Sequence, residues 1–379
     1  MQTFMNFLDT ALFIHDKPNI QKFYLGIDES FDESRVNRWI TTIMKRKVEE
    51  FGLFVKSLNP SSIFPLSFIT CNSWTLLDLG FYIKTEFKIP YSISFPKLKI
   101  LRLNGLSFVN KNSRNFFSNC PILEELSLSY CSISEGLCIV NPALKHLSIS
   151  SYRLLNNSSV EISAPDLLTI TYRGKLPPDF ALNSFQSLVE AVVDFYIDDD
   201  EEYDYLGKVF VKLFEKLSSA TLLKVCTYSF LADILLTNLP PFNNLTHLEV
   251  RSKLILWSLN VDTVRRFFRF IQILPNLKSI VFGQRIDIPE EEYDECWELD
   301  PKSSLPRLKS IIFKVFEGQP EELNAVKLFL KYAGVLESLT IEASYWLSTD
   351  HQLDVTKLLL TFPRPADCVV KYLTSTPNA

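Results

Sequence analysis

The stretch that decides the fold is CPILEELSLSYCSI, residues 120–133. Leu123, Leu126 and Leu128 fall at L-x-x-L-x-L, and Cys131 with an isoleucine two residues later extends the pattern to L-x-x-L-x-L-x-x-C-x-L. Side chains alternate along a strand, so Leu126 and Leu128 both point into one core, and Leu123 enters it from the bend before the strand. The Cys131 thiol is placed to bond the backbone where the chain turns away. One such unit cannot bury its own apolar face, so the pattern predicts stacked neighbours.

Those neighbours recur along the chain. The spacing between first positions is 21 to 25 residues from Leu98 to Leu188, and 28 to 32 residues from Leu245 to Leu336. Several repeats carry a proline two residues before the first position. Weaker candidates for first positions precede this series at Ile20, Val48 and Trp74, and Leu222 with Val225 fills the gap in its middle. The first positions of the clear repeats are Leu98, Leu123, Leu144, Leu167, Leu188, Leu245, Leu277, Leu308 and Leu336.

A series of about a dozen such units is typical of leucine-rich repeats, which have a period of roughly 20–29 residues. The predicted fold class is therefore α/β, a leucine-rich-repeat solenoid (horseshoe) with strands on the concave face and helices on the convex face. We expect residues 1–300 to form the solenoid. Residues 301–379 would add C-terminal repeats and a cap continuous with it.

Composition excludes several classes of function. The chain has 379 residues, a net charge of −5 and only 10 glycines. Few glycines argue against phosphate-binding loops, and the absence of a basic run argues against nucleic acid as a partner. No stretch reaches the roughly 18 apolar residues of a membrane span, and the N-terminus lacks a basic signal region. Seven scattered cysteines without a CxxC pair predict reduced, mostly buried thiols, hence a cytoplasmic or nuclear protein.

Periodicity of i, i+3, i+4, i+7 predicts the helices. One begins the chain with Phe4, Phe7, Leu8 and Ala11 on its buried face, and a proline at position 320 opens another that Gly334 would end in a left-handed cap. The other predicted helices are 36–43, capped from Ser30, Asp32 or Ser34, then 112–120, 206–217 and 264–271. Residues 61–70 and 176–182 are predicted as proline-containing connections, and residues 368–373 as a terminal strand.

Two acidic stretches, 198–202 and 289–295, have open interpretations. The first could bind Ca²⁺, but it lacks the glycine and the spaced terminal glutamate of an EF-hand loop. A solvated loop that places negative charge before the next helix explains it better.

No catalytic motif stands out, so we expect no enzyme, no cofactor and no metal. The four histidines, His15, His146, His247 and His351, form no HExxH pattern, and neither GxSxG nor a P-loop occurs. A Cys–His nucleophile pair stays open at this stage, although packing explains a cysteine at the repeat turn.

The predicted functional surface is the concave face, formed by side chains between and after the inward apolar residues. It is mixed polar and charged, which suits recognition of a protein through contacts spread over many repeats. The candidate partner-binding residues are Arg102, Glu125, Tyr130, His146, Arg173, Glu190, His247, Glu249, Arg251 and Lys314. Each of these could equally be an ordinary solvated strand residue.

Several segments together resemble plant F-box proteins with leucine-rich repeats and a C-terminal FBD region. The resemblance rests on NIQKFYL (19–25), RVNRWI (35–40), KVEEF (47–51), FPKLKILRL (95–103), CPILEEL (120–126), CW (296–297), LPRLKSI (305–311) and an FBD-like stretch from 305 to 373. Members of that family begin with an F-box of about forty residues that docks the Skp adaptor of a cullin ubiquitin ligase. No L-P-D-x-L-L-type opening occurs here, and the chain starts where that module should have ended.

The resemblance implies a non-catalytic module that selects a protein substrate for ubiquitination. A Skp adaptor would be a partner only if the full-length product contains an F-box; no nucleic acid and no membrane is expected. Two alternatives remain: an F-box-less regulator or decoy that binds the same partners, and a small-molecule, hormone-type receptor.

Overall fold

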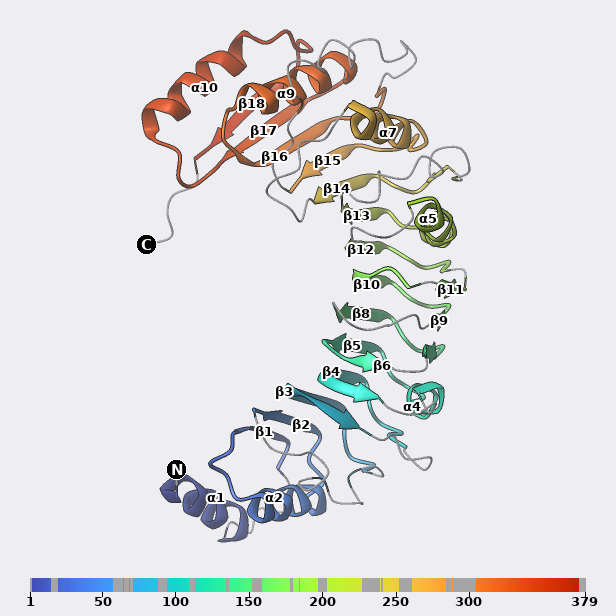
Figure 1. Ribbon diagram of the computed structural model, residues 1–379, viewed down its shortest axis with the longest axis vertical. Coiled ribbons are helices and arrows are strands. Elements are labelled where there is room, and N and C mark those ends of the chain that lie inside the picture. The colour runs from blue at the N-terminus through green and yellow to red at the C-terminus, as the bar shows by residue number, and fades with distance from the viewer. Residues whose placement is uncertain are drawn as a thin grey trace. The chain divides into compact units, whose positions relative to one another are not determined.

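The structure is a computed structural model that describes residues 2–14, 20–56, 64, 68, 71–87, 94–108, 113–133, 136–151, 159–177, 180–183, 185–196, 203–226, 239, 241–251, 261–283, 288 and 305–374 (Figure 1). The acidic stretches, His15, residues 296–297 and most of 61–70 lie outside them. The chain divides into two compact units, Met1–Ser187 and Leu188–Ala379. Each is a mixed α/β structure around an open parallel sheet.

In the first unit, strands lie side by side in chain order. Leu103, Leu128, Ile149 and Tyr172 are aligned across four neighbouring strands, as the repeat pattern predicts. All four side chains are at most 3% exposed. The sheet order is β1 (Lys22–Ile27), β2 (Glu50–Val55), β3 (Leu76–Phe87), β4 (Ile100–Phe108), β5 (Glu125–Ser129), β8 (His146–Ser151) and β10 (Thr169–Lys175).

Short strands as well as helices lie on the return segments behind this sheet. The helix predicted at 112–120 is present as α4 (Ser113–Ser118). It contacts a second parallel sheet of order β11-β9-β7, and β6 (Ser132–Ile133) pairs with β4. The repeats between Leu123 and Leu188, which are 21 to 23 residues long, have room for an extended return segment only. The second sheet consists of β7 (Leu137–Val140), β9 (Val160–Ser163) and β11 (Phe180–Leu182).

The second sheet corrects two expectations. Residues 176–182 are not merely a connection, because they contain β11. The convex-side helices expected here are replaced by strands whose side chains alternate between buried and half-buried, as in β7 and β9. That alternation over four residues was visible in the sequence, but such short runs do not by themselves distinguish strands from loops.

Helix α2 (Glu33–Lys45) forms where the sequence predicts it. Asp32 is its N-cap, accepting hydrogen bonds from the Arg35 backbone N–H at 2.9 Å and the Ser34 hydroxyl at 2.5 Å. Val36, Trp39, Ile40 and Ile43 are completely buried. A carboxylate at this position also complements the positive end of the helix dipole.

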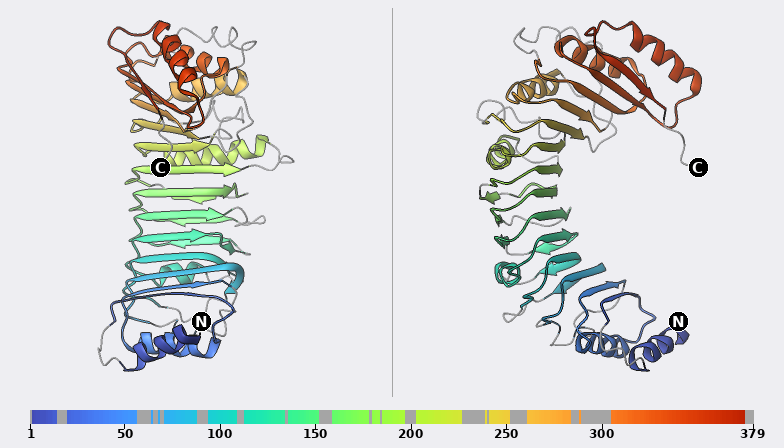
Figure 2. Two further views of the ribbon diagram at one scale, coloured as in Figure 1. Left: turned by 90° about the vertical axis from the view of Figure 1, so that its left-hand side faces the viewer. Right: turned by 180° about the vertical axis from the view of Figure 1, so that it is seen from behind.

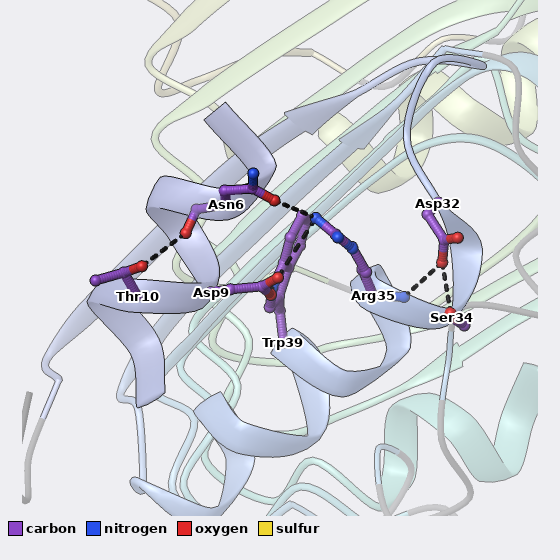
Figure 3. Close-up of polar contacts among 7 residues, drawn as sticks. All are labelled: Asn6, Asp9, Thr10, Asp32, Ser34, Arg35 and Trp39. Atoms are coloured by element: carbon purple, nitrogen blue, oxygen red, sulfur yellow. Dashed lines mark hydrogen bonds and ion pairs between the residues drawn. The ribbon is translucent and has the colours of Figure 1, made fainter. Parts of the chain in front are cut away.

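Helix α1 (Gln2–Ile14) is present, but its buried face differs from the prediction. Phe4 and Phe7 are 45% and 65% exposed, whereas Met5, Leu8 and Leu12 are buried. Polar contacts with α2 set this orientation (Figure 3). The Trp39 indole N–H donates to Asp9 at 2.6 Å, and the Arg35 guanidinium donates to Asn6 at 3.0 Å and lies 3.4 Å from the Asp9 carboxylate.

The second unit combines a parallel sheet with helices. Longer repeats leave room for a helix on the return path, and the Phe329 ring of α9 packs against inward rings of Phe282 and Phe313. The sheet order is β12 (Glu190–Tyr196), β13 (Leu222–Cys226), β14 (His247–Arg251), β15 (Ser279–Phe282), β16 (Ser310–Phe316), β17 (Ser338–Ala343) and β18 (Val369–Leu373). The helices are α5 (Tyr203–Leu217), α7 (Val261–Gln272), α9 (Pro320–Tyr332) and α10 (Thr349–Thr361). None of the described helices is long and apolar enough to cross a membrane.

Two predictions fail in the second unit, and one helix was not predicted. The repeat in the gap has Leu223 and Val225 as its inward residues, so Leu222 is not its first position but an outward, half-buried residue. Gly334 does not adopt the left-handed conformation, since α9 ends at Ala333 with φ −96°. Helix α10 buries only Val355 and Leu359, too few apolar contacts for its pattern to be recognised.

The repeat cysteines bond the backbone, as the pattern predicts. The Cys131 thiol donates to the Leu103 carbonyl at 3.4 Å, and Cys226 makes the same contact with the Phe195 carbonyl at 3.4 Å. Burial raises the pKa of the Cys131 thiol to about 12. A thiol with so high a pKa stays protonated and serves packing instead of nucleophilic chemistry.

The aligned core predicts a large cost for truncating one inward leucine. Leu126 is fully buried, and we expect Leu126→Ala to lower the free energy of unfolding by about 2–5 kcal/mol, because a cavity opens between neighbouring strands. Urea unfolding followed by circular dichroism measures the change. Ser127→Ala, on the outward side of the same strand, should change it by less than about 0.5 kcal/mol. Equal losses in both variants would contradict the inward–outward assignment.

Candidate functional site

Each sheet has one covered face and one open face. Strand side chains alternate between buried and more exposed positions, as in β5 and β8. In the part of the chain that the structure describes, helices and the small sheet lie on the buried side of the large sheets (Figure 2). We call the outward residues of β1, β2, β3, β4, β5, β8 and β10 the unit-1 face and those of β12–β18 the unit-2 face.

Strand register arranges the unit-1 face in rows. Because the strands pair in parallel, residues at equal positions become lateral neighbours. The first row is Lys22, Glu50, Leu76, Ile100, Glu125, His146 and Thr169. The second is Tyr24, Gly52, Asp78, Arg102, Ser127, Ser148 and Thr171, and the third is Gly26, Phe54, Gly80, Asn104, Ser129, Ser150 and Arg173.

The predicted binding residues are divided between the two faces. Arg102, Glu125, His146 and Arg173 lie on the unit-1 face. Tyr130 follows β5, has a positive φ of 51° and is 63% exposed. The unit-2 face contains Glu190, His247, Glu249, Arg251 and Lys314.

Two of these residues on the unit-1 face are engaged with each other. The Arg102 guanidinium donates through Nε and Nη2 to Glu125 Oε1, at 3.0 and 2.8 Å. The hydrogen bond to this carboxylate raises the pKa of Arg102. Because the two opposite charges largely cancel, this pair exerts little net electrostatic attraction on a binding partner.

Charges on the unit-2 face form an alternating chain across three strands. Lys224 Nζ lies 2.7 Å from Glu190 Oε1 and 4.0 Å from Glu249 Oε2, and Arg251 Nε donates to Glu249 Oε1 at 2.7 Å. The Arg251 side chain packs over the next strand, where a Cβ at Gly283 would lie 3.3 Å from Arg251 Cγ. Lys224 was not among the predicted residues, and the sequence pattern placed the repeat in that region two residues too far along the chain.

The histidines form no catalytic or metal-binding group among the described residues. His146 Nδ1 pairs with the Thr169 hydroxyl at 2.9 Å, and His247 Nδ1 with Thr246 at 2.8 Å. His351 Nε2 pairs with the Glu317 carbonyl at 2.9 Å. In the part of the chain that the structure describes, no group of three or more His, Cys, Asp or Glu residues could hold a metal ion.

An aromatic and glycine-rich corner of the unit-1 face was not predicted. The Tyr24 ring lies over Gly52 of the next strand, and the Phe54 ring lies over Gly80 of the strand after that. These rings are 49% and 37% exposed. The sequence feature that could have predicted this corner is the pair of glycines, Gly52 and Gly80, at outward strand positions. A glycine there leaves the backbone bare, so a ring from the neighbouring strand can cover it.

Comparison with known proteins now identifies the relatives of this fold. Residues 36–181 match the family model described as FBD-associated F-box protein At5g56370, LRR repeats. The chain is a relative of the plant F-box/FBD/LRR-repeat proteins. The match spans α2 to β11, and so includes most of the strands that build the unit-1 face.

Similarity to individual members of this family extends over nearly the whole chain. F-box/LRR-repeat protein At4g14096 of Arabidopsis thaliana is 27% identical over 94% of this chain and 77% of its own length. F-box/FBD/LRR-repeat protein At1g78750 of the same plant is 26% identical over 96% of this chain and 81% of its length. F-box/LRR-repeat protein 13 is 25% identical, covering 96% and 82% respectively. The resemblance inferred from the sequence is confirmed.

The charge chain on the unit-2 face predicts a salt-dependent stability effect. Lys224→Met should lower the free energy of unfolding by about 1 kcal/mol at low salt, because Glu190 and Glu249 lose the cation between them. The loss should shrink at 0.5 M NaCl, where screening weakens the pairs. Lys278→Met, an exposed lysine at the entry to the next strand, is the matched control with no expected loss. A salt-independent deficit would show that packing, and not charge pairing, is responsible.

Proposed function

We propose that this chain is a non-catalytic protein-binding module, the substrate-recognition part of a cullin-type ubiquitin ligase F-box protein. The observation that carries the proposal is the open, polar sheet face in a relative of F-box/LRR-repeat proteins. A Skp adaptor would dock only to an F-box in the full-length product. The protein substrate would be held by the open faces described above.

The chemistry of the unit-1 face supports protein recognition. Its middle is built from small hydroxyl side chains, which allow a partner to approach closely and offer both donors and acceptors of hydrogen bonds. Paired charges at its margins contribute more to selectivity than to affinity. The central residues are Ser127, Ser129, Ser148, Ser150 and Thr171.

The buried thiols and dispersed histidines support a function without catalysis. A nucleophilic cysteine needs a lowered pKa and a nearby base, whereas burial raises the pKa of Cys120 and of Cys131 to about 12. His146 and His247 interact with threonine hydroxyls instead. The same face needs no cofactor to bind a polypeptide.

We further propose that residues 1–300 form a horseshoe-shaped solenoid with the open faces on its concave side, and that residues 301–379 continue it as an FBD-like set of repeats and cap. Small-angle X-ray scattering should give a radius of gyration clearly above the ~21 Å of a compact globule of 379 residues. A value near that of the compact globule would contradict the solenoid.

Blocking the unit-1 face should remove substrate binding. Ser148→Trp fills the hydroxyl-lined centre, and we expect it to reduce capture of partner proteins from plant extract at least tenfold, measured by quantitative mass spectrometry. Ala181→Trp, at an exposed position on the back sheet, is the matched control and should leave capture unchanged. Equal capture by both variants would contradict binding through this face.

Adaptor binding is a separate measurement. The chain alone should not co-purify with a Skp adaptor, whereas the chain fused behind an F-box should. If the fused protein binds the adaptor but its captured partners are not ubiquitinated, the decoy function replaces the one proposed here.

A further inference from the structure

We propose that Asp78, flanked by the rings of Tyr24 and Phe54, forms an anchor subsite on the unit-1 face that takes a lysine or arginine side chain of the protein partner. This inference rests on the proposed function and adds to it the chemistry that one part of the face recognises. None of these three residues was among the predicted binding residues.

Asp78 is a half-buried carboxylate that no described side chain or backbone group binds. It is the third residue of β3 and points outward, between Gly52 on one neighbouring strand and Arg102 on the other. No residue within the described ranges donates a hydrogen bond to it or forms an ion pair with it. Arg102, the nearest cation, directs Nε and Nη2 to Glu125 instead. Because the side chain is only half-buried, its oxygens can exchange water for a donor of the partner.

Aromatic rings lie on two sides of the carboxylate. A Cβ at Gly52 would lie only 2.3 Å from Tyr24 Cδ1, which places the Tyr24 ring on the backbone directly across from Asp78. A Cβ at Gly80 would lie 2.6 Å from Phe54 Cδ1, which places the Phe54 ring two residues along the same strand. Glycine at both positions is therefore what allows the rings to approach the carboxylate.

The surroundings favour a long cationic side chain. The half-buried side chains of Leu76 and Ile100, in the adjacent row, offer an apolar track for its aliphatic stem. Its charged end would meet a carboxylate for a charge-assisted hydrogen bond and two neighbouring aromatic rings for cation–π attraction. Lysine and arginine combine these features, whereas an apolar side chain would leave the carboxylate desolvated and unpaired.

The charge balance points the same way. Lys22 pairs with Glu50 at 2.9 Å, and Arg102 pairs with Glu125 at 2.8 Å, so these four charges cancel. Asp78 adds one negative charge to this corner without compensation. A partner's cation would neutralise it, and a partner's carboxylate would be repelled.

An unpaired carboxylate in such a place should cost stability. Desolvation raises the pKa of Asp78, partly opposed by the charge of Arg102. A raised folded-state pKa means that stability falls as pH rises from the ordinary aspartate value of about 3.9 through the folded value. Asp78→Asn should therefore have a higher Tm than the natural chain at pH 7, and the difference should disappear below pH 3.

The binding test uses the full chain and a synthetic peptide library with random flanks and a fixed central residue. The central residue is Lys, Arg, acetyl-lysine, norleucine or Glu, and binding is measured by fluorescence polarisation. We expect the Lys and Arg pools to bind at least tenfold better than the acetyl-lysine, norleucine and Glu pools. Asp78→Asn should abolish that preference, and Gly52→Ala, which displaces the Tyr24 ring, should weaken it.

Asp166→Asn is the matched control, because it removes the same charge from an exposed position just before β10 and should keep the preference. Peptide binding without a preference for a basic residue, or with a preference unchanged in Asp78→Asn, overturns the subsite while the proposed function stands. No peptide binding in any pool, together with unimpaired capture by Ser148→Trp, rejects both. The Tm measurement verifies that each variant is folded.

Discussion

Parallel pairing of the repeat strands, with inward leucines aligned, is the constraint on which this structure depends. No repeat has enough apolar surface to form a core alone, so Leu126 and Leu128 are buried only because Leu101, Leu147 and their neighbours lie beside them. The pairing also satisfies the backbone of each strand. A one-residue slip of a strand would turn all of its inward apolar side chains to the open face, so burial determines the strand register. That register in turn aligns the outward residues of neighbouring strands in rows.

Repeat length decides what covers the back of each sheet. Where first positions are 21 to 23 residues apart, as between Leu123 and Leu188, the returning chain is extended and forms the sheet of β7, β9 and β11. Where they are 28 to 32 residues apart, the return contains helices such as α7 and α9. The thiols of Cys131 and Cys226 bond backbone carbonyls at the end of a strand in both units, so this feature is independent of how the return is built.

The open faces differ in how their charges are used. On the unit-2 face, Glu190, Lys224, Glu249 and Arg251 satisfy one another, and such pairs organise the surface more than they attract a partner. On the unit-1 face Lys22 and Glu50 pair within the first row, and Arg102 of the second row pairs with Glu125 of the first. Asp78 is left beside the Tyr24 and Phe54 rings. Aromatic side chains are enriched at binding hot spots, and stability can be given up for function at such sites.

The sequence by itself determined the repeat class, the position of most strands and the outward direction of nearly all predicted binding residues, because alternation along a strand is a local property. It also located α2 but left its cap open among Ser30, Asp32 and Ser34, of which the structure selects Asp32. Only the tertiary structure decided the orientation of α1, which follows its contacts with Arg35 and Trp39, and the nature of the return segments, whose short apolar runs fit strand and loop alike. The Asp78 subsite could not be predicted either, since Tyr24, Gly52 and Asp78 come from three strands and meet only when the strands pair in register.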